Sequence, residues 1–387
     1  MSRAAGQRGR YDVIVLGLGG MGSAAARQLA RRGAAVLGLE QFTPAHALGS
    51  SHGDTRIVRT AYFEHPDYVP LLRRAYRLWD ELGAAIGRPL LVRTGALMIG
   101  APDSAVVTGT LASAHRWDLA HELLDAGQLR QRYPQFRLRS HEVAVFEADA
   151  GYVDPEDTVR AHLTLARRDG AELRFGAKVT AWRPDGDGVL VDFDGGRARA
   201  RSLVLAAGAW TAALAPGLGV PLRVGRRVMH YLSPRTDAAQ FDAIRFPVYF
   251  FDTGPGDGIY GFPLVGEASN GVKVGFHYRG GDADPDTVNR EVSAAERDEM
   301  RALLAERIPD LAGEHVDARV CMYTLTPDEN FVIDLLPGSS GRVTVAAGFS
   351  GHGFKFTPVV GEILADLALS GATEQPIDFL SATRFTR

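Results

Sequence analysis

The rarest basic and nucleophilic residues are the first candidates for chemistry in this chain. Lys and Arg together number 43, but only three of them are lysines, Lys178, Lys273 and Lys355. Lysine carries a compact ammonium that can titrate, so each lysine is either incidental or kept for that property. Cys321 is the single cysteine, which excludes an intramolecular disulfide. It is either a buried small hydrophobic residue, a nucleophile or a covalent anchor.

Arginine and histidine are concentrated in residues 52–59, whose sequence is HGDTRIVR. Arg56 and Arg59 are three residues apart and would share one face of a helical turn. A guanidinium binds a carboxylate through two parallel hydrogen bonds, so the pair predicts a carboxylate site. In a chain this rich in arginine, a solvated or salt-bridged pair is the alternative interpretation.

A glycine-rich segment, residues 348–355 with the sequence GFSGHGFK, directly precedes a predicted helix. Thr357 is expected to be the N-cap of this helix, and Pro358 suits its first turn. The glycines would let the chain pass close to a flat ligand, to which the helix N-terminus presents positive potential. A strand-to-helix turn with one exposed histidine and one exposed lysine is the alternative.

Near the start of the chain, three glycines fit the pattern G-x-G-x-x-G: Gly17, Gly19 and Gly22. A buried strand is predicted over 11–16, a helix over 23–32 and a second strand over 35–39, which ends at Glu40. In such a unit the glycines permit a tight turn against a pyrophosphate, and the acid accepts hydrogen bonds from a ribose. The pattern predicts dinucleotide binding without separating NAD from FAD. A glycine turn in an unrelated α/β protein is the alternative.

The rest of the chain predicts a mixed α/β protein. Helices are expected over 67–82, 155–169 and 357–370. Strands are expected over 178–182, 189–193, 202–207 and 343–347. The part from 216 to 320 is rich in strand and turn signals, whereas 86–150 is hard to divide into elements. We therefore expect a nucleotide domain built from separate pieces of the chain and interrupted by a β-rich domain.

The composition excludes several classes of protein. A hydrophobic content of 45% over 387 residues can fill a core, which argues against a disordered chain. No apolar run is long enough for a membrane-spanning helix, and a net charge of −3 does not suggest a nucleic-acid binder. Neither residues 1–10 nor the last three residues carry a targeting signal, so we expect a cytoplasmic protein. A metal site is not expected, since no H-x-x-x-H spacing occurs beside the single cysteine.

Five segments together resemble the monomeric sarcosine oxidase and N-methyltryptophan oxidase family of FAD-dependent amine oxidases, and the resemblance runs nearly end to end. They are SHGDTRIVRTAY from Ser51, IYGFP from Ile259, VKVGFH from Val272, CMYTLTPDENFVID from Cys321 and AAGFSGHGFKF from Ala346. The resemblance implies an FAD-binding Rossmann-like domain of the glutathione-reductase type and a substrate domain with a mostly antiparallel β-sheet. The FAD-binding pieces are expected at 11–85, 150–215 and 321–387, and the substrate-binding pieces at 86–149 and 216–320.

The resemblance further implies that FAD is attached covalently, from the flavin 8α-methyl to the sulfur of Cys321. His52 and Arg56 would lie beside the flavin and assist this attachment. Further FAD contacts are expected from the glycine motifs and their neighbours: Gly17, Gly19, Gly20, Met21, Gly22, Glu40, Gly208, Trp210, Met322, Phe349, Gly351, Gly353 and Lys355.

Catalytic roles are implied in the same way. Arg59 and Lys355 resemble the pair that binds the substrate carboxylate. Lys273 resembles the lysine that activates oxygen, through a water near flavin N5. The substrate pocket is expected to be lined by three more residues: Tyr260, His277 and His352. Arg56 would act with this set, whereas Lys178 matches no such role.

The implied reaction is oxidation of an N-methyl or cyclic secondary amino acid, with hydride transfer to flavin N5, an imine product and reduction of O₂ to H₂O₂. One alternative is a flavin-dependent dehydrogenase that uses an acceptor other than oxygen, and another is an oxidase of a cyclic imino acid in a biosynthetic pathway. A nucleotide-binding protein without catalysis is a third. The family resemblance favours a monomer.

Two loops depart from the family pattern. The loop over 261–272 is about two residues longer than in sarcosine oxidases and carries Glu267, Ser269 and Asn270. The segment 252–257 also differs. These departures leave the substrate open among sarcosine, a bulkier N-methyl amino acid, and a cyclic imino acid such as proline or pipecolate.

Overall fold

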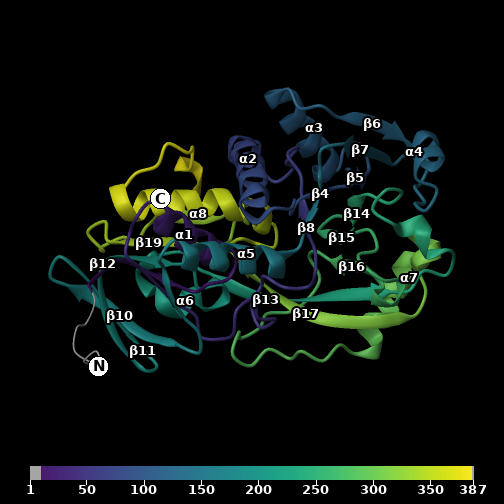
Figure 1. Cartoon of the computed structure of the whole chain (residues 1–387). Coiled ribbons are helices and arrows are strands. Elements are labelled where there is room, and N and C mark those ends of the chain that lie inside the picture. The colour runs from purple at the N-terminus through teal and green to yellow at the C-terminus, as the bar shows by residue number, and fades with distance from the viewer. Residues whose placement is uncertain (1–9, 386–387) are drawn as a thin grey trace. The chain divides into compact units, whose positions relative to one another are not determined.

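The computed structural model describes residues 10–385 and divides the chain into two units (Figure 1). The first unit comprises the described part of Met1–Ser51 together with Glu156–Arg223 and Thr324–Arg387. The second unit comprises His52–Pro155 and Val224–Tyr323. Residues 1–9 and 386–387 lie outside the described residues.

The first unit is built on a sheet whose central strands are parallel. Its strands are β1 (Arg10–Leu16), β2 (Val36–Leu39), β9 (Glu172–Arg174), β10 (Val179–Asp185), β11 (Gly188–Phe193), β12 (Gly196–Leu205), β18 (Val332–Leu335) and β19 (Val343–Ala347). Its helices are α1 (Gly20–Arg31), α5 (Pro155–Arg168), α6 (Thr211–Leu214) and α8 (Thr357–Ser370). The parallel order is β9-β2-β1-β12-β19, and β10 and β11 extend it as an antiparallel meander beside β12. Helices α1 and α8 pack side by side (Figure 1).

The second unit contains an eight-stranded sheet and a separate three-stranded sheet. Its strands are β3 (Arg56–Val58), β4 (Val92–Arg93), β5 (Ala96–Gly100), β6 (Glu122–Asp125), β7 (Val143–Glu147), β8 (Gly151–Val153), β13 (Arg223–Leu232), β14 (Val248–Gly254), β15 (Asp257–Gly261), β16 (Val272–Phe276) and β17 (His315–Leu325). Its helices are α2 (Tyr68–Ile86), α3 (Ala105–Trp117), α4 (Ala126–Arg132) and α7 (Ala294–Arg307). The order is β17-β13-β16-β15-β14-β5-β7-β6, and a small sheet holds β3-β8-β4.

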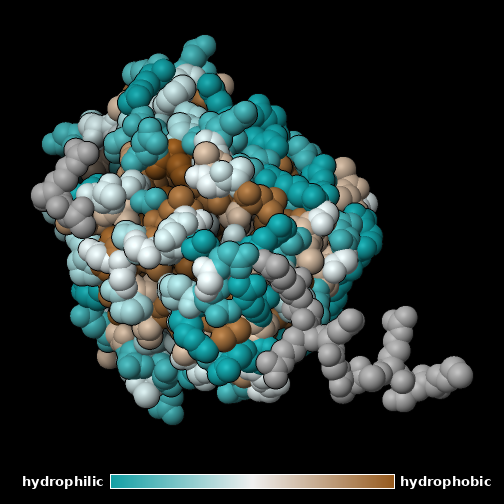
Figure 2. Space-filling model, turned by 90° about the vertical axis from the view of Figure 1, so that its left-hand side faces the viewer, coloured by the Kyte–Doolittle hydropathy of each residue, from teal (hydrophilic) through white to brown (hydrophobic). Residues whose placement is uncertain are grey.

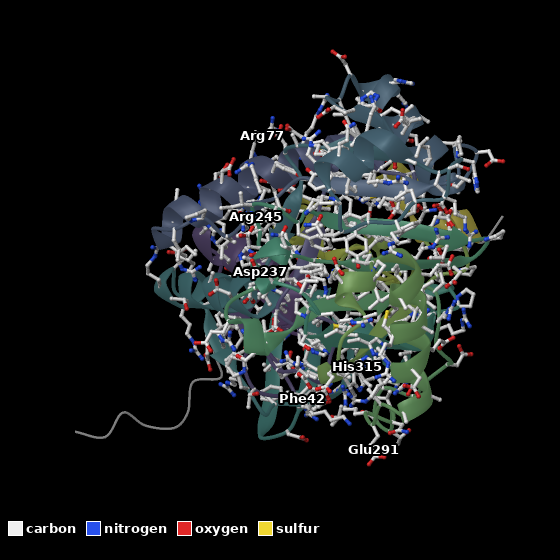
Figure 3. The ribbon with its side chains drawn as sticks, turned by 90° about the vertical axis from the view of Figure 1, so that its right-hand side faces the viewer. Phe42, Arg77, Asp237, Arg245, Glu291 and His315 are labelled. Atoms are coloured by element: carbon white, nitrogen blue, oxygen red, sulfur yellow. The ribbon has the colours of Figure 1, made fainter. Side chains whose placement is uncertain are left out.

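This large sheet is mostly antiparallel, with β14 and β5 as a parallel pair. The hydrophobic core of this unit includes Phe136 and Phe246 from two loops, whose rings stack with their centroids 5.0 Å apart. At the edge of the same core, Figure 3 shows Asp237 and Arg245 close together. Asp237 accepts a hydrogen bond from the amide of Ala239, and Arg245 donates one to the carbonyl of Ala239, so the two side chains brace one short turn.

The observed units confirm the predicted fold class, a Rossmann-like domain and a mostly antiparallel one. Their division differs from the predicted one: residues 52–85, 150–155 and 321–323 lie in the second unit rather than with the FAD-binding pieces, and residues 216–223 lie in the first. The reason is pairing: β3 forms its ladder with β8, placing Arg56 opposite Val153 in a sheet of the second unit. Residues 86–150, which gave no clear pattern, contain short strands and two helices.

Ion pairs are frequent on the outer strands of the first unit. Asp192 on β11 binds both Arg183 and Arg197, and Arg199 binds Asp185 across the hairpin. Hydrophilic residues cover much of the face seen in Figure 2, with hydrophobic ones between them. None of the helices in the described part of the chain has the length and apolar character needed to cross a membrane.

His162 on α5 is a buried histidine that predicts a pH dependence of stability. Its side chain is fully buried, and neither ring nitrogen has a hydrogen-bond partner among residues 10–385. Burial, with a smaller contribution from the charge of Arg27, lowers the pKa of His162 to about 3. The unfolded chain therefore binds a proton at this histidine below about pH 6.5, whereas the folded chain does not. The free energy of unfolding then falls by up to about 1.4 kcal/mol per pH unit as the pH drops below that value.

Replacing His162 with leucine is expected to remove this loss. Urea unfolding at pH 7, 6 and 5 should show a flatter decline for His162→Leu than for the unaltered chain, by the equivalent of about one proton. The exposed His141 is the control, and His141→Gln should leave the slope unchanged. An unchanged slope in His162→Leu would show that this histidine is not neutral in the folded protein.

Candidate functional site

In the first unit, the glycine turn between β1 and α1 leaves no room for side chains. Gly17 has a φ of +85°, and a Cβ on Gly22 would lie 1.8 Å from the carbonyl oxygen of Gly17. Helix α1 starts at Gly20, three residues earlier than predicted, with Gly19 as an N-cap that makes no side-chain hydrogen bond. The first turn of the helix therefore follows the turn directly, which suits the binding of a phosphate by backbone N–H groups.

Glu40 lies where the sequence predicted it, directly after β2. Its carboxylate is 6% exposed and accepts hydrogen bonds from the amides of Leu18, at 2.9 Å, and Phe42, at 3.0 Å. Burial alone would raise the pKa of Glu40, but hydrogen bonds from His46 and these amides lower it. Glu40 is thus an ionised acceptor held against the glycine turn.

Two buried threonine hydroxyls mark a polar site near the second glycine segment. Thr357 is not the N-cap, as predicted, but the first residue of α8, because the short 3₁₀ helix Phe354–Phe356 runs directly into it. Its Oγ1 and that of Thr324 are buried and have no hydrogen-bond partner within residues 10–385. A buried hydroxyl without a partner is costly, so these two groups fit a ligand with polar atoms.

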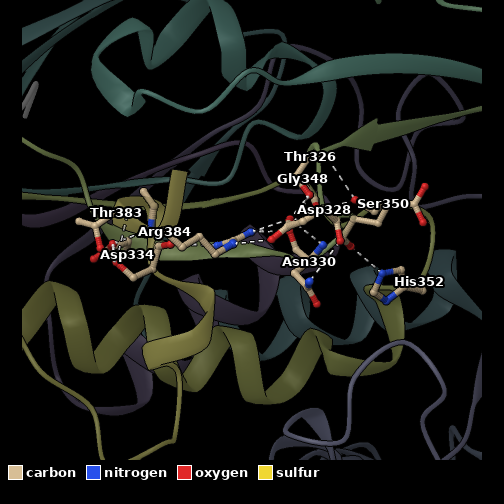
Figure 4. A network of polar contacts seen from close by, with 12 residues as sticks. Thr326, Asp328, Asn330, Asp334, Gly348, Ser350, His352, Thr383 and Arg384 are labelled. Carbon is tan, nitrogen blue, oxygen red and sulfur yellow. Dashed lines mark hydrogen bonds and ion pairs between the residues drawn. The ribbon is translucent and has the colours of Figure 1, made fainter. Parts of the chain in front are cut away.

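The segment between β19 and α8 is folded back on itself. Ser350 and Gly351 have φ values of +46° and +84°, and the Ser350 amide donates to the carbonyl of Thr324 at 2.9 Å. His352 contacts the carbonyl oxygen of Glu329 through Nε2 at 3.0 Å (Figure 4). Lys355 is buried and donates to the carbonyl of His352 at 2.7 Å. The alternative of an exposed histidine and lysine is therefore wrong.

The loop that carries Glu329 is anchored by the end of the chain. Arg384 donates to both carboxylate oxygens of Asp328, at 2.8 and 3.1 Å, and to the carbonyl of Asn330 (Figure 4). Thr326 also donates to the carbonyl of Asn330, at 2.7 Å. These bonds fix the backbone against which His352 rests.

The other predicted residues of the first unit lie in the same two regions. Gly208 has a φ of +55° and opens the 3₁₀ helix that follows β12. The ring of Trp210 lies 5.5 Å from that of Phe42, just beyond Glu40. A Cβ on Gly353 would lie 2.4 Å from the ring of Phe349. By contrast, Lys178 is exposed, in agreement with its having no predicted role.

In the second unit, Lys273 on β16 is buried and held by three oxygens. Its Nζ lies 2.6 Å from the carbonyl oxygen of Gly53, 2.8 Å from that of Thr55 and 3.2 Å from the hydroxyl of Thr55. Its side chain also passes over the ring of Phe262. These three acceptors are neutral, so they position the positive charge of the ammonium without cancelling it.

His52 lies near the charges of Lys273 and Arg56, and its ring makes no hydrogen bond within residues 10–385. The residue is 2% exposed, and both ring nitrogens lack a hydrogen-bond partner in the described part of the chain. Burial, together with smaller contributions from the charges of Arg56 and Lys273, lowers the pKa of His52 to about 3. His52 is therefore a neutral ring in a positive environment, and its two free nitrogens fit contact with a bound group.

Arg56 and Cys321 come together as the sequence predicted. Nη2 of Arg56 lies 3.8 Å from Sγ of Cys321, which is 3% exposed and packs against Met229 and Tyr231. Gly53 packs closely against the same cluster, since a Cβ there would lie 2.6 Å from the sulfur of Met229. Arg56 begins strand β3, so the expected helical turn through Arg56 and Arg59 is wrong.

An aromatic group lies beside this cysteine. The ring of His277 is 6.4 Å from that of Tyr260 and 5.5 Å from that of Tyr323. Burial raises the pKa of Tyr260 to about 12, and a side-chain hydrogen bond with Tyr323 opposes the shift. Arg227 lies over the ring of Tyr323, at 5.0 Å from its centroid. These side chains form an aromatic surface with the cation of Arg227 at its border.

Arg59 is buried and already holds a carboxylate. Its Nη2 binds both oxygens of Glu64, at 2.8 and 2.6 Å, and its Nη1 donates to the carbonyl of Ala61. The guanidinium also lies over the rings of Tyr62 and Phe63. Arg59 thus pairs with Glu64 through one nitrogen rather than through the two parallel hydrogen bonds of a fork, because Nη1 is bound to Ala61. Binding of a substrate carboxylate by Arg59 stays a prediction.

Four residues of this region were missed by sequence reasoning. They are Glu64, Arg227, Tyr323 and Glu147, whose carboxylate accepts the amides of the two residues after Arg59. Tyr323 could have been found, because residues two apart on a strand share a face and Cys321 lies on the same strand. Glu64 also had a signal, as an acid five residues after Arg59. Glu147 and Arg227 reach the site through sheet pairing, for which the sequence shows no local sign.

Comparison with known proteins agrees with this arrangement. A family model described as FAD dependent oxidoreductase matches residues 12–367. The chain is 48% identical over 374 residues to monomeric sarcosine oxidase of Streptomyces avermitilis, which covers 97% of each chain. It is 36% identical over 380 residues to N-methyl-L-tryptophan oxidase of Salmonella dublin, covering 98% of this chain and 100% of the relative. Among solved structures, NikD, described as an unusual amino acid oxidase essential for nikkomycin biosynthesis, matches with a TM-score of 0.84 and 30% identity, over 96% of this chain and 97% of NikD.

Proposed function

We propose that this chain, which belongs to the family of FAD-dependent oxidoreductases, is an oxidase of N-methyl or cyclic secondary amino acids that passes electrons to O₂. The observation that carries the proposal is the buried ammonium of Lys273. Three neutral oxygens hold it beside a neutral histidine, in the unit that also presents Arg59 and the single cysteine. The names of the curated relatives, sarcosine oxidase and N-methyl-L-tryptophan oxidase, support the substrate class.

The residues of the chain fit FAD as the cofactor. In the first unit, the glycine turn and Glu40 would hold its pyrophosphate and ribose, and the unpartnered hydroxyls of Thr324 and Thr357 would receive hydrogen bonds from it. In the second unit, the unpartnered nitrogens of His52 serve the same end. When bound, FAD supplies the acceptor for the hydride of the amine and the donor of electrons to O₂.

The protein's own groups would do the rest of the work. Arg59 binds the substrate carboxylate through its guanidinium and so aligns the C–H bond that reacts. Tyr260 and Tyr323, whose pKa values burial raises, offer an uncharged aromatic surface beside His277, which favours the unprotonated, reactive form of the amine. Lys273 supplies a fixed positive charge where negative charge develops during the reaction with oxygen.

The proposed function is tested by a panel of amines with two readouts. Sarcosine, N-methyl-L-tryptophan, L-proline and L-pipecolate are supplied in turn, and both H₂O₂ and substrate consumption are measured. An oxidase forms about one H₂O₂ per amine oxidised. Turnover with a dye but without H₂O₂ would favour the dehydrogenase, and no turnover with either acceptor would contradict the proposal.

Covalent attachment of FAD to Cys321 is part of the proposal. The guanidinium of Arg56, 3.8 Å from the sulfur, places a positive charge where a thiolate nucleophile needs one. Acid precipitation of the unaltered protein should leave the yellow colour in the pellet, whereas Cys321→Ala should release all of it to the supernatant. The intact mass should fall by one FAD in the variant beyond the change of side chain. Colour released from the unaltered protein would contradict the attachment.

Two further properties stay proposals. The chain is proposed to be a monomer, in line with the name of the Streptomyces relative, and to work in the cytoplasm. Light scattering of the purified protein tests the first, and cell fractionation tests the second.

A further inference from the structure

The backbone that follows Arg59 is held by a buried acid from another strand. One carboxylate oxygen of Glu147 accepts the amide of Thr60 at 2.7 Å, and the other accepts the amide of Ala61 at 2.9 Å. Glu147 is the last residue of β7, where it pairs with Ala96 of β5 (Figure 1). Its position is therefore set by the large sheet of the second unit rather than by the segment that it binds.

The carboxyl group of Glu147 is buried close enough to Arg59 for the two to interact electrostatically. Its side chain is 7% exposed, and burial raises its pKa, opposed by the amides of Ala61 and Thr60 and by the charge of Arg59. Each of its two oxygens accepts one amide, an arrangement that suits a carboxylate, whose oxygens only accept. Glu147 thus holds the backbone close to Arg59 without occupying the guanidinium.

The rest of the segment is held by helix α3. Ser113 on α3 donates to the carbonyl of Tyr62, and Trp117 donates to the carbonyl of Pro66 at 2.8 Å. Gly109 packs so closely that a Cβ there would lie 2.5 Å from the carbonyl oxygen of Phe63. Between these fixed points, the contact that can change without moving the backbone is the side-chain pair of Arg59 and Glu64.

We propose that Glu147 is a positioning residue for Arg59: it fixes the backbone at Thr60 and Ala61, so that the guanidinium can exchange Glu64 for the carboxylate of a substrate without rearrangement of the chain. This role rests on the proposed function, because it assumes that Arg59 binds a substrate carboxylate. Glu147 itself does not touch the substrate. Its effect is expected on carboxylate affinity and not on the reaction with oxygen.

The test uses propionate and its uncharged analogue propionamide as probes of the complete protein with its flavin. Dissociation constants are measured by calorimetry for the unaltered protein and for Glu147→Gln. The glutamine keeps the size of the side chain but can accept only one of the two amides. Propionate binding is expected to weaken about tenfold, the loss of one charge-assisted hydrogen bond, whereas propionamide binding should not change.

Two further variants separate positioning from a general loss of stability. Glu142 is also buried in the second unit and binds Arg307 at 3.0 Å, so Glu142→Gln disturbs the fold equally without touching the segment. Its propionate affinity should stay unchanged. In an Arg59→Met background, Glu147→Gln should cause no additional loss. If Glu147→Gln does not yield folded protein, Glu147→Asp keeps the charge, shortens the reach to the amides, and should weaken propionate in the same direction.

The outcomes distinguish the two proposals. Propionate binding that depends on Arg59 but is unaffected by Glu147→Gln overturns the role of Glu147 alone. The same holds for equal losses in Glu142→Gln and for a loss that persists in the Arg59→Met background. If Arg59→Met leaves propionate binding unchanged in the first place, the carboxylate site of the proposed function fails, and the role of Glu147 fails with it.

Discussion

Replacing Lys273 with methionine should slow the reaction of the reduced enzyme with O₂ by about 10²–10³-fold, the usual effect of removing one preorganised electrostatic group. Reduction by the amine should change by less than about threefold. The reason is that the ammonium is fixed by Gly53 and Thr55 before the reaction begins, so its charge needs no reorganisation when electrons reach oxygen. Methionine has a similar length and no charge, so it isolates the electrostatic effect.

The two half-reactions are measured separately by stopped flow. The enzyme is first mixed anaerobically with the amine, and the reduced enzyme is then mixed with oxygenated buffer. Lys178→Met is the matched control, because Lys178 is an exposed lysine and its loss should leave both rates unchanged. Methionine at 273 also removes three hydrogen bonds to buried oxygens, so thermal unfolding should begin at a lower temperature. Equal losses in both half-reactions would show a structural role instead.

The first unit could be predicted from the sequence because its signals are local. A strand, a glycine turn, a helix and a terminal acid follow each other within residues 10–40, and each has a pattern that needs no partner from elsewhere. The start of α1 was missed by three residues because glycines rarely begin a predicted helix. Here Gly20 and Gly22 are inside the helix, since α8 and the turn pack too closely against it for larger residues.

The second unit shows what local signals cannot supply. The stretch 86–150 pairs β5 with both β7 and β14, and β14 lies about 150 residues further along the chain. The pair of arginines was interpreted as a helical turn because their spacing allows it. They lie instead on and just after β3, whose ladder with β8 decides the conformation. Long-range pairing therefore overrode a correct local spacing.

The candidate site was predictable where a residue type is rare. Cys321, Lys273 and Lys355 could be singled out because the chain holds one cysteine and three lysines. The acids that balance the site could not be singled out in this way among 46 acidic residues. Glu64 had only the weak signal of lying five residues after Arg59, and Glu147 became visible only through its bonds to the amides that follow Arg59.

Replacing Arg59 with methionine is expected to lower kcat/KM for a secondary amino acid by about 10²–10³-fold, the range for removing one partner of a buried, hydrogen-bonded charge pair. Most of this loss should come from a higher KM rather than from a lower kcat, because the carboxylate is bound before and during the reaction. Arg59 is 4% exposed and now binds both oxygens of Glu64, so a substrate must displace that acid to gain the same two bonds.

Glu64→Gln is the matching variant, and it is expected to change carboxylate affinity in the direction opposite to Arg59→Met. The variant removes the competing charge, so carboxylates should bind several-fold more tightly than to the unaltered protein. It also leaves Arg59 buried without its partner, which is expected to lower the unfolding temperature until a carboxylate is added. Steady-state kinetics and thermal unfolding with and without propionate check both effects. Should Arg59→Met and Glu64→Gln shift carboxylate affinity in the same direction, or not at all, Arg59 would be a structural ion pair, and the substrate anion would have to bind elsewhere in the protein.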